Sequence, residues 1–257
     1  MKIVTKLGAH MSTEAGAENA LYRGALIGCN VIQIFIKGNR RWEFTSYNES
    51  EIEKFNQGKI KTGIKEVIAH SRYLINLASL NEEIQNKSIN TLEKELINCD
   101  KLGINYLVLH PGSGPDSNLA IEKITNSINS IFDKNNSNAI IALENTAGQG
   151  NYVGSNFEEL ANLINKIKNK NRIGICLDTC HAWAAGYDFS TLETYNKFWQ
   201  MFNSTIGLEY LKVMHINNSK NKQGSHVDRH EDIDKGQINI EAFELIYCVF
   251  LHLRMLN

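Results

Sequence analysis

The amino-acid sequence predicts an α/β protein whose fold class is a TIM-type (β/α) barrel. Three observations predict it. Short apolar runs alternate with longer segments of helical periodicity, an order that favours a parallel sheet with helices outside it. The ends of successive runs lie 25 to 40 residues apart, roughly the length of one strand–helix unit. The chain has 257 residues, a length that such barrels use as a single domain.

Seven strand-like runs each end on a residue suited to metal chemistry or to packing beside a metal. Parallel strands in a barrel bring their carboxyl ends to one rim, where barrel enzymes place their active sites. We therefore expect the run-end residues to meet. The runs are Val4–His10, Val31–Phe35, Glu66–His70, Tyr106–His110, Ala139–Glu144, Ile173–Asp178 and Leu211–His215.

Helical segments with apolar residues on one face fill the intervals between these runs. No linker rich in Pro, Gly or Ser divides the chain, so we expect residues 1–257 to form one barrel domain. The predicted helices are Glu14–Ile27, Ser50–Thr62, Asn81–Leu102, Leu119–Lys134, Phe157–Lys168 and Leu192–Ile206.

The composition limits the classes of function. The formal net charge is −1, so a polyanion partner would need a local positive field, which bound divalent ions could supply. The five cysteines form no C-x-x-C pair, which favours buried free thiols in a reducing compartment. No apolar stretch is long enough for a secretion signal or a membrane span. We expect a cytoplasmic protein without a membrane partner.

The last five runs end on nitrogen or oxygen ligands for a borderline or hard cation. A single histidine at a strand end is commonly an ordinary hydrogen-bonded residue, but five such ends on one rim favour a metal site. A carboxylate after a very apolar run would be costly to bury unless it is paired or bound to a metal. The five residues are His70, His110, Glu144, Asp178 and His215.

Two short spacings extend this set. Asp178 and His181 are three residues apart in D-T-C-H, so the turn that leaves the strand can present both to the same rim. Asp228 and His230 are two residues apart in D-R-H, and an extended backbone points such residues the same way. His181, Asp228 and His230 would then form a three-ligand site with an open position.

Seven motifs that follow one another along residues 1–243 closely resemble the endonuclease IV family, the zinc-dependent apurinic/apyrimidinic endonucleases of base-excision repair. They are G-A-H-M-S (8–12), H-S-R-Y-L-I-N-L (70–77), H-P-G-S (110–113), L-E-N-T-A-G-Q-G (143–150), C-L-D-T-C-H-A-W-A-A-G-Y-D (176–188), M-H-I-N (214–217) and V-D-R-H (227–230).

The resemblance implies a cluster of three Zn²⁺ ions and the hydrolysis of the phosphodiester 5′ to an abasic site in duplex DNA. The products would be a 3′-hydroxyl and a 5′ deoxyribose phosphate, and Glu144, Asp178 and His181 would be catalytic. An all-nitrogen and oxygen ligand set also suits Mn²⁺ or iron. The implied ligands are His70, His110 and bridging Glu144 for the first ion, Glu144, Asp178 and His215 for the second, and His181, Asp228 and His230 for the third.

The resemblance also implies two wedges that enter the DNA. Lys37–Trp42 matches a family loop that enters the base stack, and Arg40 aligns with its intercalating arginine. Tyr73 and Leu74 match a second wedge. Side chains of this kind stabilise kinked DNA and a flipped-out nucleotide. We expect a monomer that acts on duplex DNA containing abasic sites.

The similarity ends after Phe243. The family continues into an eighth strand whose glutamate completes the second metal site, whereas residues 244–257 form an atypical tail without Glu or Asp beyond Glu244. The apolar spacing in Glu241–Met255 predicts a helix instead. We therefore expect a barrel that lacks a proper eighth strand, unpaired edges on its first and seventh strands, and a weakened second metal site.

Two functions stay open on the sequence alone, and a third has weaker support. The first is an active apurinic/apyrimidinic endonuclease. The second is a truncated relative, weakly active or inactive, that binds metal or damaged DNA without efficient turnover. The third is another metal-dependent barrel enzyme such as a sugar isomerase, against which stand the D-R-H motif and the wedge loops.

Overall fold

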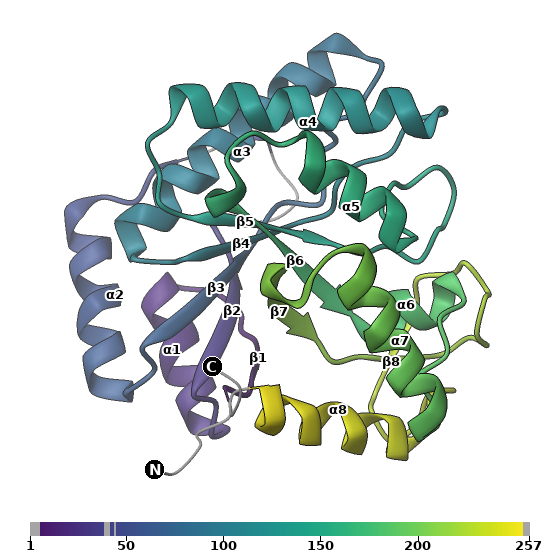
Figure 1. Ribbon diagram of the computed structural model, residues 1–257. Helices are drawn as coiled ribbons and strands as arrows, with labels where there is room; N and C mark the ends of the chain where they lie inside the picture. Colours follow the sequence, from purple (N-terminus) through teal and green to yellow (C-terminus); the bar gives the residue numbers. More distant parts are fainter. Residues whose placement is uncertain (1–5, 39–41, 44, 254–257) are drawn as a thin grey trace.

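The computed structural model describes residues 6–38, 42–43 and 45–253, with residues 248–253 described by their backbone only. Its centre is a seven-stranded parallel sheet in which each strand pairs with the next one along the chain (Figure 1). The strands are β1 Gly8–His10, β2 Val31–Phe35, β3 Glu66–His70, β4 Tyr106–Leu109, β5 Ile140–Glu144, β6 Ile173–Asp178 and β7 Leu211–His215. This order confirms the predicted fold class.

Helices connect the strands and cover the outside of the sheet (Figure 1). Side chains cap their first turns: Asn48 and Glu51 form a capping box on α2, and Asn81, Asp116 and Asn156 cap α3, α4 and α5. The helices are α1 Ala17–Leu26, α2 Glu49–Thr62, α3 Glu82–Leu102, α4 Ser117–Lys134, α5 Phe157–Lys166, α6 Thr179–Ala185, α7 Leu192–Thr205 and α8 Ile240–Leu253.

The helices mostly lie within one or two residues of the predicted bounds, and two of them differ by more. The first begins at Ala17 rather than Glu14, because Ala15 and Gly16 have positive φ values of 64° and 129° that a right-handed helix excludes. A short helix, α6, follows β6 directly where a turn was expected. Asp178 at the end of β6 caps α6 by accepting a hydrogen bond from the His181 backbone N–H at 2.9 Å. The last described segment, α8, is a helix, as predicted.

The core lies in two layers. Inside the curved sheet, Val108, Ala142, Cys176 and Val213 pack together on strands β4 to β7. Between the sheet and the helices lies a larger cluster, which includes Phe55, Leu92, Ile128 and Leu160. No described helix is long and apolar enough to cross a membrane.

The sheet is open between its first and last strands. Within the described residues, β1 pairs only with β2 and β7 pairs only with β6. All three residues of β1 are exposed, whereas all six of β6 are buried. A separate antiparallel pair, β8 (Asn218–Ser219) and β9 (His230–Glu231), follows β7. The expected unpaired edges are thus present among the described residues.

Candidate metal centre

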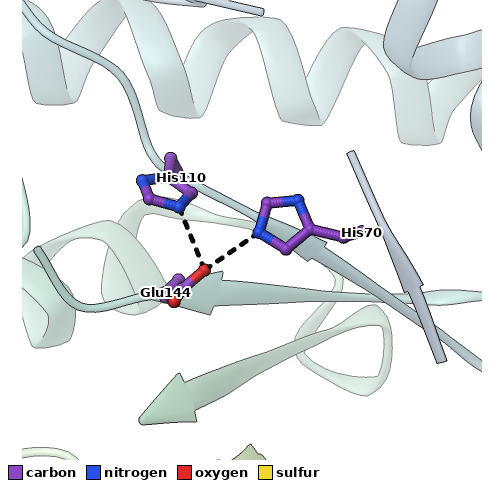
Figure 2. Close-up of side chains that lie close together, drawn as sticks. All are labelled: His70, His110 and Glu144. Atoms are coloured by element: carbon purple, nitrogen blue, oxygen red, sulfur yellow. Dashed lines mark ion pairs between the residues drawn. The ribbon is translucent and has the colours of Figure 1, made fainter. Parts of the chain in front are cut away.

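The ends of β3, β4 and β5 bring His70, His110 and Glu144 together (Figure 2). Glu144 Oε2 lies 3.3 Å from His70 Nε2 and 3.1 Å from His110 Nε2. The three strands are neighbours in the sheet, and His110 follows the last residue of β4 directly. We call these three residues the first cluster.

The first cluster has the geometry of a cation site. The Glu144 side chain is nearly fully buried, and its Oε2 atom makes no hydrogen bond of normal geometry. Ligand atoms bound to one tetrahedral zinc at about 2.0–2.1 Å lie about 3.3 Å from one another, which matches the observed separations. His70 Nδ1 is 2.7 Å from the Ser71 carbonyl, to which it must donate, so Nε2 is left to face the cluster.

A second set surrounds the other oxygen of Glu144. His215 Nδ1 on β7 lies 2.8 Å from Glu144 Oε1 and 3.8 Å from Asp178 Oδ2 on β6. Asp178 Oδ2 also accepts a hydrogen bond from Asn217 Nδ2 at 2.7 Å. This second cluster, Glu144, Asp178 and His215, is therefore looser than the first at Asp178. His215 and Glu144 are already hydrogen-bonded to each other, and Asp178 is hydrogen-bonded to Asn217.

The third cluster combines His181 on α6 with Asp228 and His230 at the start of β9. Asp228 Oδ2 lies 3.3 Å from His181 Nε2, and the other carboxylate oxygen, Oδ1, lies 3.3 Å from His230 Nε2. The two Nε2 atoms are 3.4 Å apart. His181 Nδ1 is 2.8 Å from the Asn145 carbonyl, which leaves Nε2 for the cluster. His230 Nε2 is also 3.8 Å from Asp178 Oδ2, so the second and third clusters adjoin.

The carboxylates and imidazoles of the three clusters strongly shift each other's pKa values. Burial acts to raise the pKa of Glu144, but the positive charges of His215 and His110 hold it well below its usual range. Burial acts to lower the pKa of His181, yet the charges of Asp178 and its other acidic neighbours raise it to about 10. Burial likewise lowers the pKa of His215, while Cys176 and Glu144 raise it well above its ordinary value. In the absence of a cation, protons on the histidines thus balance the negative charge of the carboxylates.

Sequence reasoning missed three neighbours of the second cluster. Gln33 on β2 accepts a hydrogen bond from His215 Nε2 at 2.8 Å, across the open side of the sheet. Asn217 contacts Asp178, and the buried thiol of Cys176 lies in one group with Glu144 and His215. A polar residue inside the apolar run V-I-Q-I-F was the available signal for Gln33. Cys176 and Asn217 lie inside quoted motifs but gave no separate signal.

The predicted DNA-binding residues lie at the edge of this centre. Tyr73 is 63% exposed in the turn after β3, with its ring 5.4 Å from the ring of His70 and 5.3 Å from that of Phe35. Leu74 is half-buried beside it. Arg40 lies outside the described residues. The structure thus brings together all eight predicted ligands and places Tyr73 and Leu74 next to the first cluster. The roles of the ligands and of Tyr73 and Leu74 stay predictions.

Known proteins resemble this chain over most of its length. A family model described as "Xylose isomerase-like TIM barrel" matches residues 21–246. A probable endonuclease 4 of Halothermothrix orenii is 41% identical over 91% of this chain and 84% of its own length. Apurinic-apyrimidinic endonuclease 1 of Saccharomyces cerevisiae is 39% identical over 94% of this chain and 67% of its own length.

Two solved structures are similar to this chain in fold. Endonuclease IV from Thermus thermophilus superposes with a TM-score of 0.81 at 32% identity, covering 92% of this chain and 86% of that one. A D-tagatose 3-epimerase-like protein has a TM-score of 0.68 at 19% identity, covering 93% of this chain and 87% of its own, a likeness in fold alone. The relatives near 40% identity and the match of the family model show that the chain belongs to the endonuclease IV family, AP endonuclease family 2.

Proposed function

We propose that the chain is a metal-dependent DNA-repair endonuclease that hydrolyses the phosphodiester 5′ to an abasic site in duplex DNA. The products would be a 3′-hydroxyl and a 5′ deoxyribose phosphate. One observation carries the proposal: Glu144 stands between His70 and His110 on one side and His215 on the other, at one rim of a barrel whose relatives are endonucleases. We expect the protein to act as a monomer in the reducing cytoplasm.

The three clusters would hold three divalent ions, with Zn²⁺ favoured by the histidine-rich ligand sets and Mn²⁺ as the alternative. The first and third clusters fit a cation best, because their ligand atoms face one another at 3.1–3.4 Å. Bound ions would supply Lewis-acid activation of water and neutralisation of the phosphate charge. With three carboxylates among the ligands, the loaded centre would carry about +3, a local field suited to a DNA backbone.

The chain's own residues supply orientation. The Glu144 carboxylate presents one oxygen to the first cluster and the other to the second, so it fixes the two clusters relative to each other. Asp178 joins the second cluster to α6 through its hydrogen bond to the His181 backbone. The exposed ring of Tyr73 offers a face on which a base can stack, and with Leu74 and Arg40 it would open the DNA above the metals.

The competing function is binding of metal or damaged DNA without efficient turnover. The observation that favours it is the loose second cluster, in which His215 is hydrogen-bonded to Gln33 and Asp178 to Asn217. A sugar-isomerase function has weaker support, since the similar epimerases share the fold at under 20% identity.

An incision assay tests the proposal. The substrate is an end-labelled duplex with one abasic site, and an otherwise identical duplex without the site is the control. We expect metal-loaded protein to cut only the abasic strand, to leave a 3′ end that a polymerase extends, and to stop cutting when a chelator is added. Tight binding of the abasic duplex without cutting would favour the competing function. Neither binding nor cutting would reject both.

A matched pair of variants shows whether the proposed centre carries the activity. Glu144→Gln should reduce incision at least about 100-fold. Glu158→Gln makes the same chemical change at an exposed position on α5 and should cut like the parent. Equal activity of Glu144→Gln and the parent would remove Glu144 from the proposal.

A further inference from the structure

Gln33 is a polar side chain on the inner face of the sheet. Its neighbours in β2, Ile32 and Ile34, are buried in the layer between the sheet and the helices. Since side chains alternate along a strand, Gln33 points to the other face, where the metal centre lies. It is partly buried there, so its amide needs hydrogen-bond partners.

The two partners of the Gln33 amide are imidazoles on the strands at either side of the opening in the sheet. Gln33 Oε1 lies 2.8 Å from His215 Nε2 on β7, and Gln33 Nε2 lies 3.1 Å from His10 Nδ1 on β1. His10 is also the direct partner of Gln33 in the pairing of β1 with β2, and the Met11 N–H donates to the Gln33 carbonyl at 2.8 Å. The backbone of β1 and the His10 ring thus hold Gln33 in place beside His215.

The amide fixes the direction of both hydrogen bonds, because its nitrogen can only donate and its oxygen can only accept. His10 therefore accepts at Nδ1, and His215 donates from Nε2. The opposite orientation of the amide would require His215 Nε2 to accept. The proton of a neutral His215 would then lie on Nδ1, the atom that faces Glu144.

The other contacts of His215 belong to the first and second clusters. Nδ1 lies 2.8 Å from Glu144 Oε1 and 3.8 Å from Asp178 Oδ2. The ring stacks on that of His70, with the centroids 6.0 Å apart and an angle of 14° between the planes. A ring nitrogen must be free of its proton to bind a cation. His215 can therefore serve the second cluster only when its proton is kept on Nε2.

We propose that Gln33, oriented by His10, is a positioning residue for the second cluster: its hydrogen bond keeps the proton of neutral His215 on Nε2 and leaves Nδ1 to a cation. This inference rests on the proposed function, in which the second cluster holds an ion. Histidines that bind a metal usually donate their other N–H to a carboxylate, a carbonyl or water, and loss of such a partner typically lowers metal affinity about 10- to 100-fold. The side-chain oxygen of Gln33 is that partner for His215.

Zinc titration against a chromophoric chelator tests the inference. Gln33→Leu removes both hydrogen bonds of the amide, whereas Gln33→Glu keeps an acceptor for His215. Gln57→Leu makes the first change at an exposed position on α2. We expect Gln33→Leu to bind one ion about 10- to 100-fold more weakly than the parent. Gln33→Glu should bind at least as tightly as the parent, and Gln57→Leu should match it. Parent-like binding by Gln33→Leu, or equal weakening in Gln33→Glu, would overturn the inference.

A double variant shows whether Gln33 acts through His215. His215→Ala should lack one ion, and the addition of Gln33→Leu should leave the affinity for the remaining ions unchanged, because the interaction is already absent. If Gln33→Leu weakens zinc binding equally with and without His215, Gln33 only supports the surrounding fold, and the inference is wrong.

The position of the proton can be observed directly by nitrogen-15 NMR of the zinc-loaded protein with labelled histidines. The imidazole signal that disappears in His215→Ala should show a proton on Nε2. A proton on Nδ1 would overturn the inference alone. A parent that binds its ions but does not cut abasic duplex would overturn the proposed function, while weaker binding of one ion by Gln33→Leu would still show that Gln33 positions His215. An ion count unchanged by His215→Ala would remove the second site and the inference with it.

Discussion

The first and third clusters have similar ligand spacing but very different support. His70, His110 and Glu144 come from three neighbouring strand ends, and His70 and Glu144 are 4% and 1% exposed. In the third cluster, His181 lies on a short helix. Asp228 precedes a two-residue strand, and His230 begins it. The side chains of Asp228 and His230 are 43% and 45% exposed.

This difference in support indicates which cluster should hold a cation more firmly. Ligands fixed by a parallel sheet keep their geometry without a cation, and burial protects the ion from solvent. Ligands on an exposed strand pair open locally more often, so their ion exchanges faster. We expect the first cluster to be the tight site and the third cluster to be the exchangeable one.

The largest effect should come from the residue that belongs to the first and second clusters. Glu144→Gln removes the carboxylate charge that faces His70, His110 and His215. We expect at least about a 100-fold loss of incision and the loss of more than one ion, because 100-fold is the upper range for residues that only support a metal ligand and Glu144 is itself a proposed ligand. Metal analysis by mass spectrometry and single-turnover incision check both expectations.

Metal removal should distinguish the first cluster from the third by the order in which their ions leave. With increasing chelator, the ion of the third cluster should leave well before the others. Asp228→Asn should lack this ion from the start. Asp133→Asn, an exposed change on α4, is the control. Simultaneous loss of all ions in the parent, or full metal content in Asp228→Asn, would contradict the ranking of the sites.

A smaller effect is expected beside the first cluster, at Tyr73. Tyr73→Ala removes an exposed ring that packs against His70 and Phe35. Stacking of a base on an aromatic ring contributes about 1–3 kcal/mol, so binding of abasic duplex should weaken by about tenfold while metal content stays the same. Tyr22→Ala on α1 should bind like the parent. Parent-like binding by Tyr73→Ala would remove the predicted wedge.

The smallest effect is a pH dependence in the metal-free protein. The pKa of His181 is raised to about 10 in the folded state, so its stabilising contribution is complete below about pH 6.5 and is lost as the pH rises toward 10. His215 acts in the same direction. The free energy of unfolding in chelator should therefore be lower at pH 9 than at pH 6.5, by more than about 1 kcal/mol. Urea unfolding measures it, and a flat or rising profile would contradict the predicted charge balance.

The sequence predicted the first cluster better than its surroundings. Apolar runs that end on His70 and Glu144 define strand ends, and parallel pairing then brings these ends together. The contact between Gln33 and His215 could not be predicted, since it crosses the open side of the sheet between residues 182 positions apart. The helix α6 was missed because D-T-C-H was interpreted as a turn, although Asp178 is a good helix cap.

The most direct test is an anomalous-difference map from crystals of the zinc-loaded protein, recorded at the zinc absorption edge. We expect one peak within bonding distance of His70, His110 and Glu144, and another among His181, Asp228 and His230. The first should persist and the second should weaken after a brief soak in chelator. Peaks absent from both clusters, or a third-cluster peak that outlasts the first, would contradict this account.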